Sequence, residues 1–236
     1  MYYNTEGCQN TALGKAMTKN CCGNNNTGLG CLALDHNVNG SNNTVVGSQA
    51  ANFITSSDNT AMGYGAAYRV VGGCQNTAIG SLALRGCETI TGNCNIAIGT
   101  KALCNITADV CRVVAVGNGA LFNFQSNNTV AVGTCAGANT TTPNTNTYVG
   151  HFAAYATTTG TDNTVMGRSV FYNNTTGSCN VAIGTDALGQ NTTANSNTAV
   201  GNCTLACNTT GCDHVAVGAG ALDANTTGNE NTAMGR

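Results

Sequence analysis

The stretch Asn10-Thr11-Ala12-Leu13-Gly14 is the first copy of the motif that decides the fold of this chain. The same pattern, Asn-Thr-Ala-hydrophobic-Gly, returns at residues 59–63, 76–80, 197–201 and 231–235, with close variants between these copies. Successive motif glycines are almost evenly spaced, and the spacing is identical in every interval from Gly133 to Gly235. A fixed short period of this kind is the signature of a solenoid. The fourteen motif glycines are Gly14, Gly30, Gly47, Gly63, Gly80, Gly99, Gly117, Gly133, Gly150, Gly167, Gly184, Gly201, Gly218 and Gly235.

The residues before each motif glycine alternate in character, as they do in a β-strand. Counting from the glycine as position 0, position −3 is Thr in nine copies and Val or Ile in the others, and position −1 is always Leu, Ile, Val or Met. These two positions share a face because side chains alternate along a strand. We expect this face to be half buried. The small residue at position −2, usually Ala, then lies on the opposite face, where another surface can approach closely.

After the glycine, each copy continues with a short apolar pair such as Ala187-Leu188 and then a polar return such as Asn174-Thr175-Thr176-Gly177. Asn and Gly tolerate turn conformations, and Thr, Asn and Gly at this density disfavour helices. Polar, repetitive sequence is also typical of disorder, but disorder does not require a hydrophobic residue in constant register before every glycine. The sequence therefore predicts an all-β parallel β-solenoid (β-roll) of about 14 coils of about 17 residues, as a single repeat domain over residues 1–236.

Composition excludes several classes of partner. Charged residues make up 8% of the chain and the net charge is −2, against roughly 25% charged residues in ordinary soluble domains. We therefore expect no nucleic-acid partner, and no apolar run approaches the roughly 20 residues needed for membrane insertion. Fourteen cysteines indicate an oxidising setting and an extracellular location, although no signal peptide is visible at the start of the sequence.

Copies such as Asn76-Thr77-Ala78-Ile79-Gly80 and Asn180-Val181-Ala182-Ile183-Gly184 resemble the head repeats of trimeric autotransporter adhesins and related repeats of phage and virus tail-fibre proteins. The resemblance covers the whole chain. It implies a left-handed parallel β-roll, often trimeric, with an adhesion or fibre function and no catalysis. This chain differs from the adhesin head repeats in two ways that bear on trimer formation: the adhesin repeat is shorter, and it is not rich in cysteine.

The positions of several cysteines predict disulfides between or within coils. Cys87 and Cys104 are separated by one regular repeat interval, and so are Cys94 and Cys111. In-register residues on stacked parallel strands lie about 4.8 Å apart, which is within the Cα separation that a disulfide bridges. We also expect local bridges between Cys8 and either Cys21 or Cys22, and between Cys207 and Cys212.

A zinc site is the alternative for part of this set. Cys203, Cys207, Cys212 and His214 have zinc-ligand side chains, but their spacing matches no zinc-finger or zinc-ribbon pattern. No nucleophile, base and orienting residue occur together, so we expect no enzyme, no metal and no cofactor. Sequons for N-glycosylation occur mainly in the polar returns, at Asn25, Asn39, Asn42, Asn105, Asn127, Asn139, Asn173, Asn174, Asn191, Asn202, Asn208 and Asn225.

Three functions remain open at this level. The first is a structural protein of an extracellular fibre or filament, whose copies stack head to tail because residues 1–7 resemble the continuation after a motif and Gly235-Arg236 ends just after one. The second is a trimeric adhesin or tail-fibre head that binds a cell surface, including surface glycans. The third is an ice-binding solenoid, which ranks last because we expect the threonines at position −3 to be buried.

Overall fold

The computed structural model describes residues 3–142 and 144–236. Fourteen β-strands of three residues each occupy positions −3 to −1 of the motif copies, and the described residues contain no helix. Neighbouring strands pair in parallel with like motif positions opposite each other, for example Thr164 with Val181 and Met166 with Ile183. The protein is therefore a parallel β-solenoid in which each coil carries one copy of the motif, as the sequence predicts. The strands are β1 (Thr11–Leu13), β2 (Thr27–Leu29), β3 (Thr44–Val46), β4 (Thr60–Met62), β5 (Thr77–Ile79), β6 (Ile96–Ile98), β7 (Val114–Val116), β8 (Val130–Val132), β9 (Thr147–Val149), β10 (Thr164–Met166), β11 (Val181–Ile183), β12 (Thr198–Val200), β13 (Val215–Val217) and β14 (Thr232–Met234).

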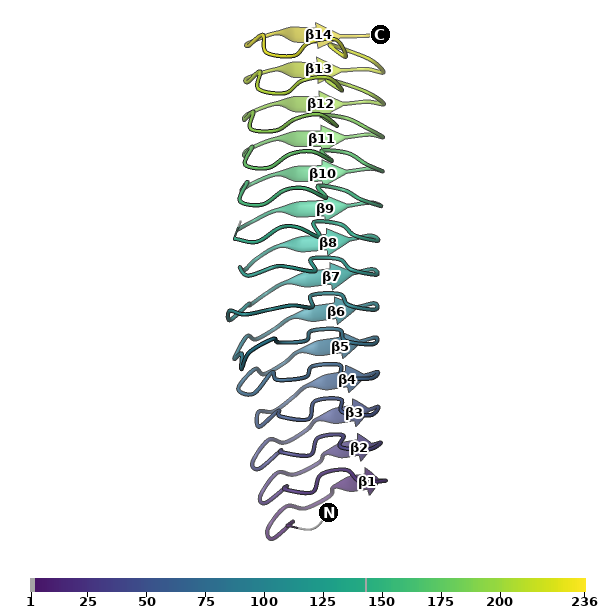
Figure 1. Ribbon diagram of the computed structural model, residues 1–236, viewed down its shortest axis with the longest axis vertical. Helices are drawn as coiled ribbons and strands as arrows, with labels where there is room; N and C mark the ends of the chain where they lie inside the picture. The colour runs from purple at the N-terminus through teal and green to yellow at the C-terminus, as the bar shows by residue number, and fades with distance from the viewer. Residues whose placement is uncertain (1–2, 143) are drawn as a thin grey trace. The chain divides into compact units, whose positions relative to one another are not determined.

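The chain divides into two compact units, one ending at Gly119 and the other beginning at Ala120. The first unit holds β1–β7 and the second holds β8–β14, and within each unit the strands stack in chain order (Figure 1). The single repeat domain expected over residues 1–236 stays a prediction.

The two faces of the strands are the reverse of the sequence expectation. Position −2 is fully buried in the strands away from the ends, as at Ala97 and Ala182, whereas positions −3 and −1 point outward. Met166, at position −1, is 46% exposed. The prediction that the −3/−1 face is the half-buried core face was wrong, because the hydrophobic character of position −1 does not mark the inside.

A narrow interior explains why the small residue faces inward. A Cβ atom on Gly28 at position −2 would lie 3.0 Å from Cε of Met17 and 3.4 Å from Cβ of Ala16. The apolar pair from across the coil, such as Ala187 and Leu188, is fully buried and already fills this space. Only a small side chain fits at most strand centres, so size rather than hydrophobicity selects the inward residue.

Columns of buried asparagines complete the interior, and sequence reasoning missed them. Asn180 at position −4 is fully buried; its Nδ2 donates to the carbonyl oxygen of Ala194 (2.9 Å), and its Oδ1 accepts the backbone N–H of Asn197 (3.0 Å). A second column follows position +7, where Asn191 Nδ2 donates to Asn174 Oδ1 (2.9 Å). Buried polar groups must be hydrogen-bonded, and one amide side chain satisfies both a donor and an acceptor of the backbone in neighbouring coils. The near-constant Asn at position −4 was the available signal.

Two separate features of the structure require glycine at the motif position. Gly184 has φ +132°, a conformation that L side chains rarely adopt, and a Cβ atom there would lie 2.2 Å from the carbonyl oxygen of Gly201 in the next coil. The glycine both turns the chain and allows coils to stack closely. This accounts for the constant spacing from which the fold was predicted.

Candidate functional site: the outer strand face and a lateral groove

The outward side chains at positions −3 and −1, which we call the outer strand face, form two parallel columns in each unit. None of these positions carries a charged residue. The −1 column is aliphatic throughout, and several of its members are more than a third exposed: Leu13, Met62, Ile79, Ile98, Val132, Met166 and Met234. An exposed, contiguous apolar surface of this kind is typical of an interaction site.

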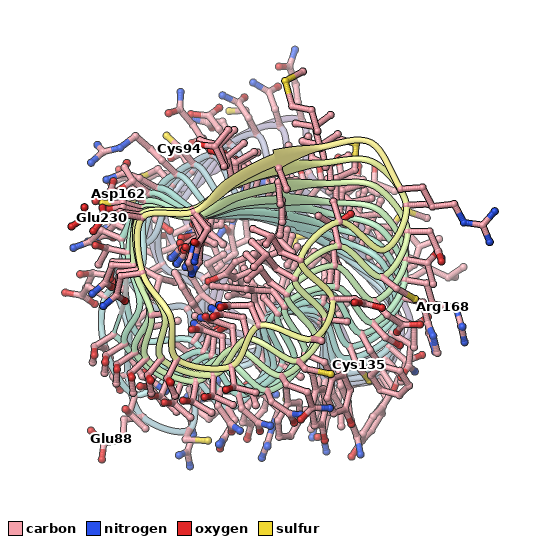
Figure 2. The ribbon with its side chains drawn as sticks, turned by 90° about the horizontal axis from the view of Figure 1, so that it is seen from above. Glu88, Cys94, Cys135, Asp162, Arg168 and Glu230 are labelled. Carbon is pink, nitrogen blue, oxygen red and sulfur yellow. The ribbon has the colours of Figure 1, made fainter. Side chains whose placement is uncertain are left out.

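A groove runs along another side of the coil, between the turn after the motif glycine and positions +5 and +6. Figure 2, viewed from above, shows Arg168 projecting on the side of this turn, whereas Asp162 and Glu230 lie on the opposite side of the coil. Hollows occur on this side of the coil in each unit, and among the described residues they include one in the first unit and two in the second. The one in the first unit has a volume of about 320 Å³ and is lined by Gln49, Tyr64, Gly65, Tyr68, Leu82 and Arg85.

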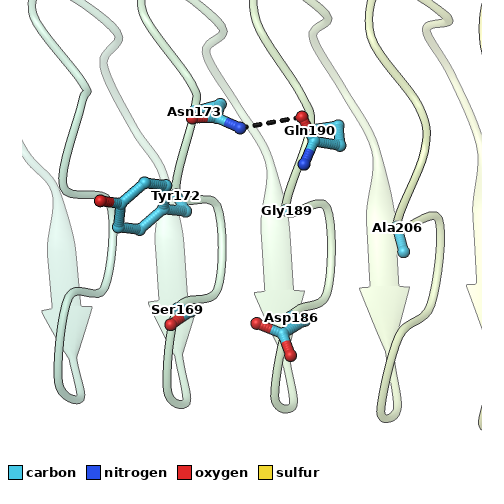
Figure 3. A pocket seen from close by; sticks show the side chains of 7 residues that line it. All are labelled: Ser169, Tyr172, Asn173, Asp186, Gly189, Gln190 and Ala206. Carbon is cyan, nitrogen blue, oxygen red and sulfur yellow. Dashed lines mark hydrogen bonds between the residues drawn. The ribbon is translucent and has the colours of Figure 1, made fainter.

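In the second unit, a hollow of about 270 Å³ lies beside the ring of Tyr172. Figure 3 shows Asn173 and Gln190 on one side of this ring and Ser169 and Asp186 on the other. Asn173 Nδ2 donates a hydrogen bond to Gln190 Oε1 (2.9 Å). Farther along the groove, a third hollow is lined by Asn202, Cys203, Ala219, Gly220, Asp223 and Arg236.

Within the residues that the structure describes, no disulfide joins any of the cysteines, so the disulfide-rich character expected from their number is not found. The motif intervals around the expected pairs, from Gly80 to Gly99 and from Gly99 to Gly117, are longer than the regular interval, which moves the partners out of register. Cys87 N–H donates to the carbonyl oxygen of Ile106, and Cys94 Sγ contacts Gln75 Oε1. The expected bridges Cys87–Cys104, Cys94–Cys111, Cys8–Cys21 or Cys8–Cys22, and Cys207–Cys212 are therefore not formed in this structure.

Some cysteines instead serve as hydrogen-bond acceptors between coils. At position −6, a side-chain oxygen usually accepts a backbone N–H from the adjacent coil, as Asn229 Oδ1 does from Cys212 (2.8 Å). Cys212 Sγ takes the same role toward Asn195 N–H (3.3 Å). Cysteine in this column therefore replaces Asn or Ser.

Cys21 and Cys22 have sulfur atoms 3.2 Å apart. A hydrogen bond with the Thr5 hydroxyl, joined by one from the Cys22 thiol, lowers the pKa of Cys21. The bond that Cys22 donates to Cys21, together with its burial, raises the pKa of Cys22 to about 11. Cys21 is thus the more acidic thiol of the pair.

The structure does not bring the zinc-type residues together. His214 is fully buried in the −4 column, whereas Cys207 is exposed. Within residues 3–142 and 144–236, no group of three or more His, Cys, Asp and Glu side chains has a geometry that could hold a metal ion. The same residues contain no helix long and apolar enough to cross a bilayer.

The sequons fall into two structural groups. Asn174, Asn191 and Asn208 are fully buried members of the +7 column, and their Nδ2 atoms donate hydrogen bonds inside the coil. A glycan on any of these three is incompatible with the folded coil. Occupancy of the others stays a prediction; Asn25, Asn39, Asn42 and Asn202 are exposed, and Asn105, Asn127, Asn139, Asn173 and Asn225 are half-buried.

Comparisons with family models, with curated proteins and with solved structures give no match to this chain.

Proposed function

We propose that this chain is a structural repeat protein of an extracellular fibre whose copies associate side by side through the outer strand face. The observation that supports this most is that the face is uncharged and that its −1 column is aliphatic in both units. Apolar area that is exposed in one copy is removed from water when a second copy covers it, which stabilises the complex by roughly 25 cal/mol per Å² before the costs of association.

A second copy of the same chain is the occupant that this face fits best. Its columns repeat with the strand spacing of about 4.8 Å, so the ridges of one copy match the furrows of another at every coil. The outer strand face carries no charge that would repel the same face of a second copy. Side-by-side association agrees with the trimeric arrangement that the resemblance to adhesin and tail-fibre repeats implies. The extracellular location rests on the number of cysteines and on that resemblance, and head-to-tail stacking remains a separate prediction that imaging of the assembly would test.

The test is the oligomeric state measured by sedimentation velocity over a range of protein concentrations. We expect a discrete oligomer for the wild-type chain and a monomer when Val132→Lys and Met166→Lys place two charges on the outer strand face. Ser196→Lys is the matched control, because position −5 already carries charged residues such as Asp162 and Asp213. A wild-type chain that stays monomeric at high concentration would contradict the proposal.

Ice binding is the second candidate, and one observation favours it. The threonines at position −3 point outward, for example Thr44, Thr164 and Thr232, which removes the reason for ranking this function last. The adjacent −1 column is aliphatic and contains no hydroxyl, which favours protein association over ordered water. Thermal hysteresis of the wild-type protein that is lost in Thr164→Lys would support ice binding instead.

A further inference from the structure

The hollow at Tyr172 arises from a step in one column of side chains. At position +5, successive coils of the second unit carry Tyr155, Tyr172, Gly189, Ala206 and Asp223. Two tyrosines are thus followed by a glycine and an alanine. The space that a third ring would fill is empty, and it is the hollow of about 270 Å³ that Tyr172, Gly189 and Ala206 help to line.

The ring of Tyr172 is held in place from one side only. It stacks on Tyr155 with ring centroids 5.2 Å apart and an interplanar angle of 13°. Phe152 meets both rings edge to face, at 5.3 Å from Tyr155 and 6.0 Å from Tyr172. Because Tyr155 covers one face of the Tyr172 ring, the opposite face lies toward the coil of Gly189, which has no side chain to cover it.

Polar groups flank this uncovered face on both sides (Figure 3). Ser169 and Asp186 lie on the side of the motif turn, and Asn173 and Gln190 lie on the other. The carboxylate of Asp186 supplies acceptors, and the amide of Gln190 supplies donors beyond the Oε1 atom that Asn173 occupies. The Arg168 guanidinium lies 3.9 Å from the Asp186 carboxylate and balances its charge.

We propose that this hollow binds one pyranose ring of an uncharged carbohydrate with the β-gluco configuration. An aromatic platform with polar groups at its edges is complementary to a ring that has apolar faces and hydroxyls around its rim. In a β-glucopyranoside every ring hydroxyl is equatorial, so both faces present only C–H groups. One face stacks on Tyr172 while the rim hydroxyls meet Asp186 and Ser169 on one side and Asn173 and Gln190 on the other.

The size of the hollow also favours a single ring. Clefts that hold drug-sized ligands or cofactors have volumes from roughly 300 Å³ upward, and this one is slightly smaller. This site lies away from the outer strand face and does not depend on self-association.

The proposal is tested by saturation-transfer NMR and titration with methyl β-D-glucopyranoside on the full chain. We expect binding with Kd roughly in the millimolar range, since one exposed ring buries little area. Tyr172→Ala removes the platform and is expected to weaken binding at least about tenfold. Gly189→Tyr extends the tyrosine column into the hollow and is expected to abolish binding.

Gly189→Tyr is a fair test because Gly189 does not have a positive φ, and the same column already carries tyrosine in the two preceding coils. The new Cβ atom would lie 3.2 Å from the carbonyl oxygen of Asp186, which requires a small shift of the backbone there. Thr193→Ala, an exposed change in the coil of Gly189, is the matched control and should bind as the wild type does. Circular dichroism establishes that each variant is folded. No saturation transfer to the wild-type protein, or undiminished binding by folded Gly189→Tyr, would overturn the proposal.

Discussion

Gly137 lies directly against the ring of Tyr148, and a Cβ atom on Gly137 would be 2.8 Å from Cδ2 of that ring. Tyr148 occupies position −2 of its strand, which is Ala in most coils, and is fully buried. Gly137 occupies position +4, where Leu121 and Leu188 stand in other coils. In this coil pair the large side chain is at position −2 and the small one at position +4, the reverse of most other coils. The total side-chain volume in the interior is therefore roughly kept.

The first prediction concerns this pair. Gly137→Leu alone should destabilise the protein by roughly 1–3 kcal/mol through overpacking, and Tyr148→Ala alone should destabilise it by leaving a cavity of the kind that costs about 3–5 kcal/mol. The double variant restores the usual Ala and Leu. Its backbone is suitable, because Leu188 has φ 49° at the same position and Gly137 has φ 57°.

A double-mutant cycle from urea unfolding measures the coupling between the two sites. We expect the double variant to be more stable than either single variant, with a favourable interaction energy of about 1–3 kcal/mol. Additive losses of stability would show that the two residues do not compensate each other.

These residues also show how far the sequence could predict the structure. The spacing of the motif glycines placed the strands and the coil, because Gly184 and its equivalents have a turn and a stacking contact that no other residue allows. The sequence could not show which face of the strand points into the coil, because both faces carry apolar residues. The change from Tyr172 to Gly189 at position +5 forms a hollow only because the two residues lie in successive coils. No sequence motif marks this change.

Tyr148→Phe is expected to leave stability unchanged or to raise it by about 1 kcal/mol, because removing an unsatisfied buried group relieves its desolvation penalty. The Tyr148 hydroxyl is buried and, like the Thr140 hydroxyl, has no partner in good hydrogen-bond geometry, although the side chains of Thr140 and Thr157 lie close enough to interact with it. Burial raises the pKa of Tyr148, so the phenol is neutral at all ordinary pH values. Thermal unfolding of the two proteins is the measurement, and a clear loss of stability in Tyr148→Phe would mean that the hydroxyl is satisfied in solution.

Asn180→Ala should destabilise the protein by about 1–3 kcal/mol, because it leaves a buried backbone group unsatisfied. The change leaves the N–H of Asn197 without its partner, whereas the carbonyl oxygen of Ala194 keeps the longer bond from Asn191 Nδ2 (3.3 Å). Asn195→Ala is the control, because Asn195 also accepts a backbone N–H, from Ser178 (2.7 Å), but is exposed to water. Urea unfolding should show a much smaller loss for the control, and equal losses would argue against a special role of the buried column.

Cys104 is expected to be among the slowest thiols to react with a disulfide reagent in the folded protein. It is only 4% exposed, and burial raises its pKa. Since the thiolate is the reactive form, a raised pKa lowers the reactive fraction at neutral pH, and the reaction should speed up as pH rises. The exposed Cys8 and Cys179 provide the comparison within the same molecule. Mass spectrometry of samples labelled for increasing times reads out each site, and early labelling of Cys104 would contradict its burial.

His214 takes the place of asparagine in the −4 column, and its ring supplies the same hydrogen-bond acceptor. Its backbone N–H donates to Asn197 Oδ1 (3.0 Å), and its Nδ1 accepts the N–H of Asn231 (3.1 Å). Nδ1 is therefore the acceptor that this position needs, and the other ring nitrogen, Nε2, lies 3.1 Å from Asn225 Nδ2. His214→Asn should retain the acceptor and change stability by less than about 1 kcal/mol, whereas His214→Ala should lose about 1–3 kcal/mol because the N–H of Asn231 is left unpaired. Urea unfolding of both variants tests whether His214 acts only as a hydrogen-bond acceptor. If it does, asparagine can replace it with little loss of stability, as asparagine fills this position in the neighbouring coils. A large loss of stability in His214→Asn would show that the ring makes a contribution that an amide cannot.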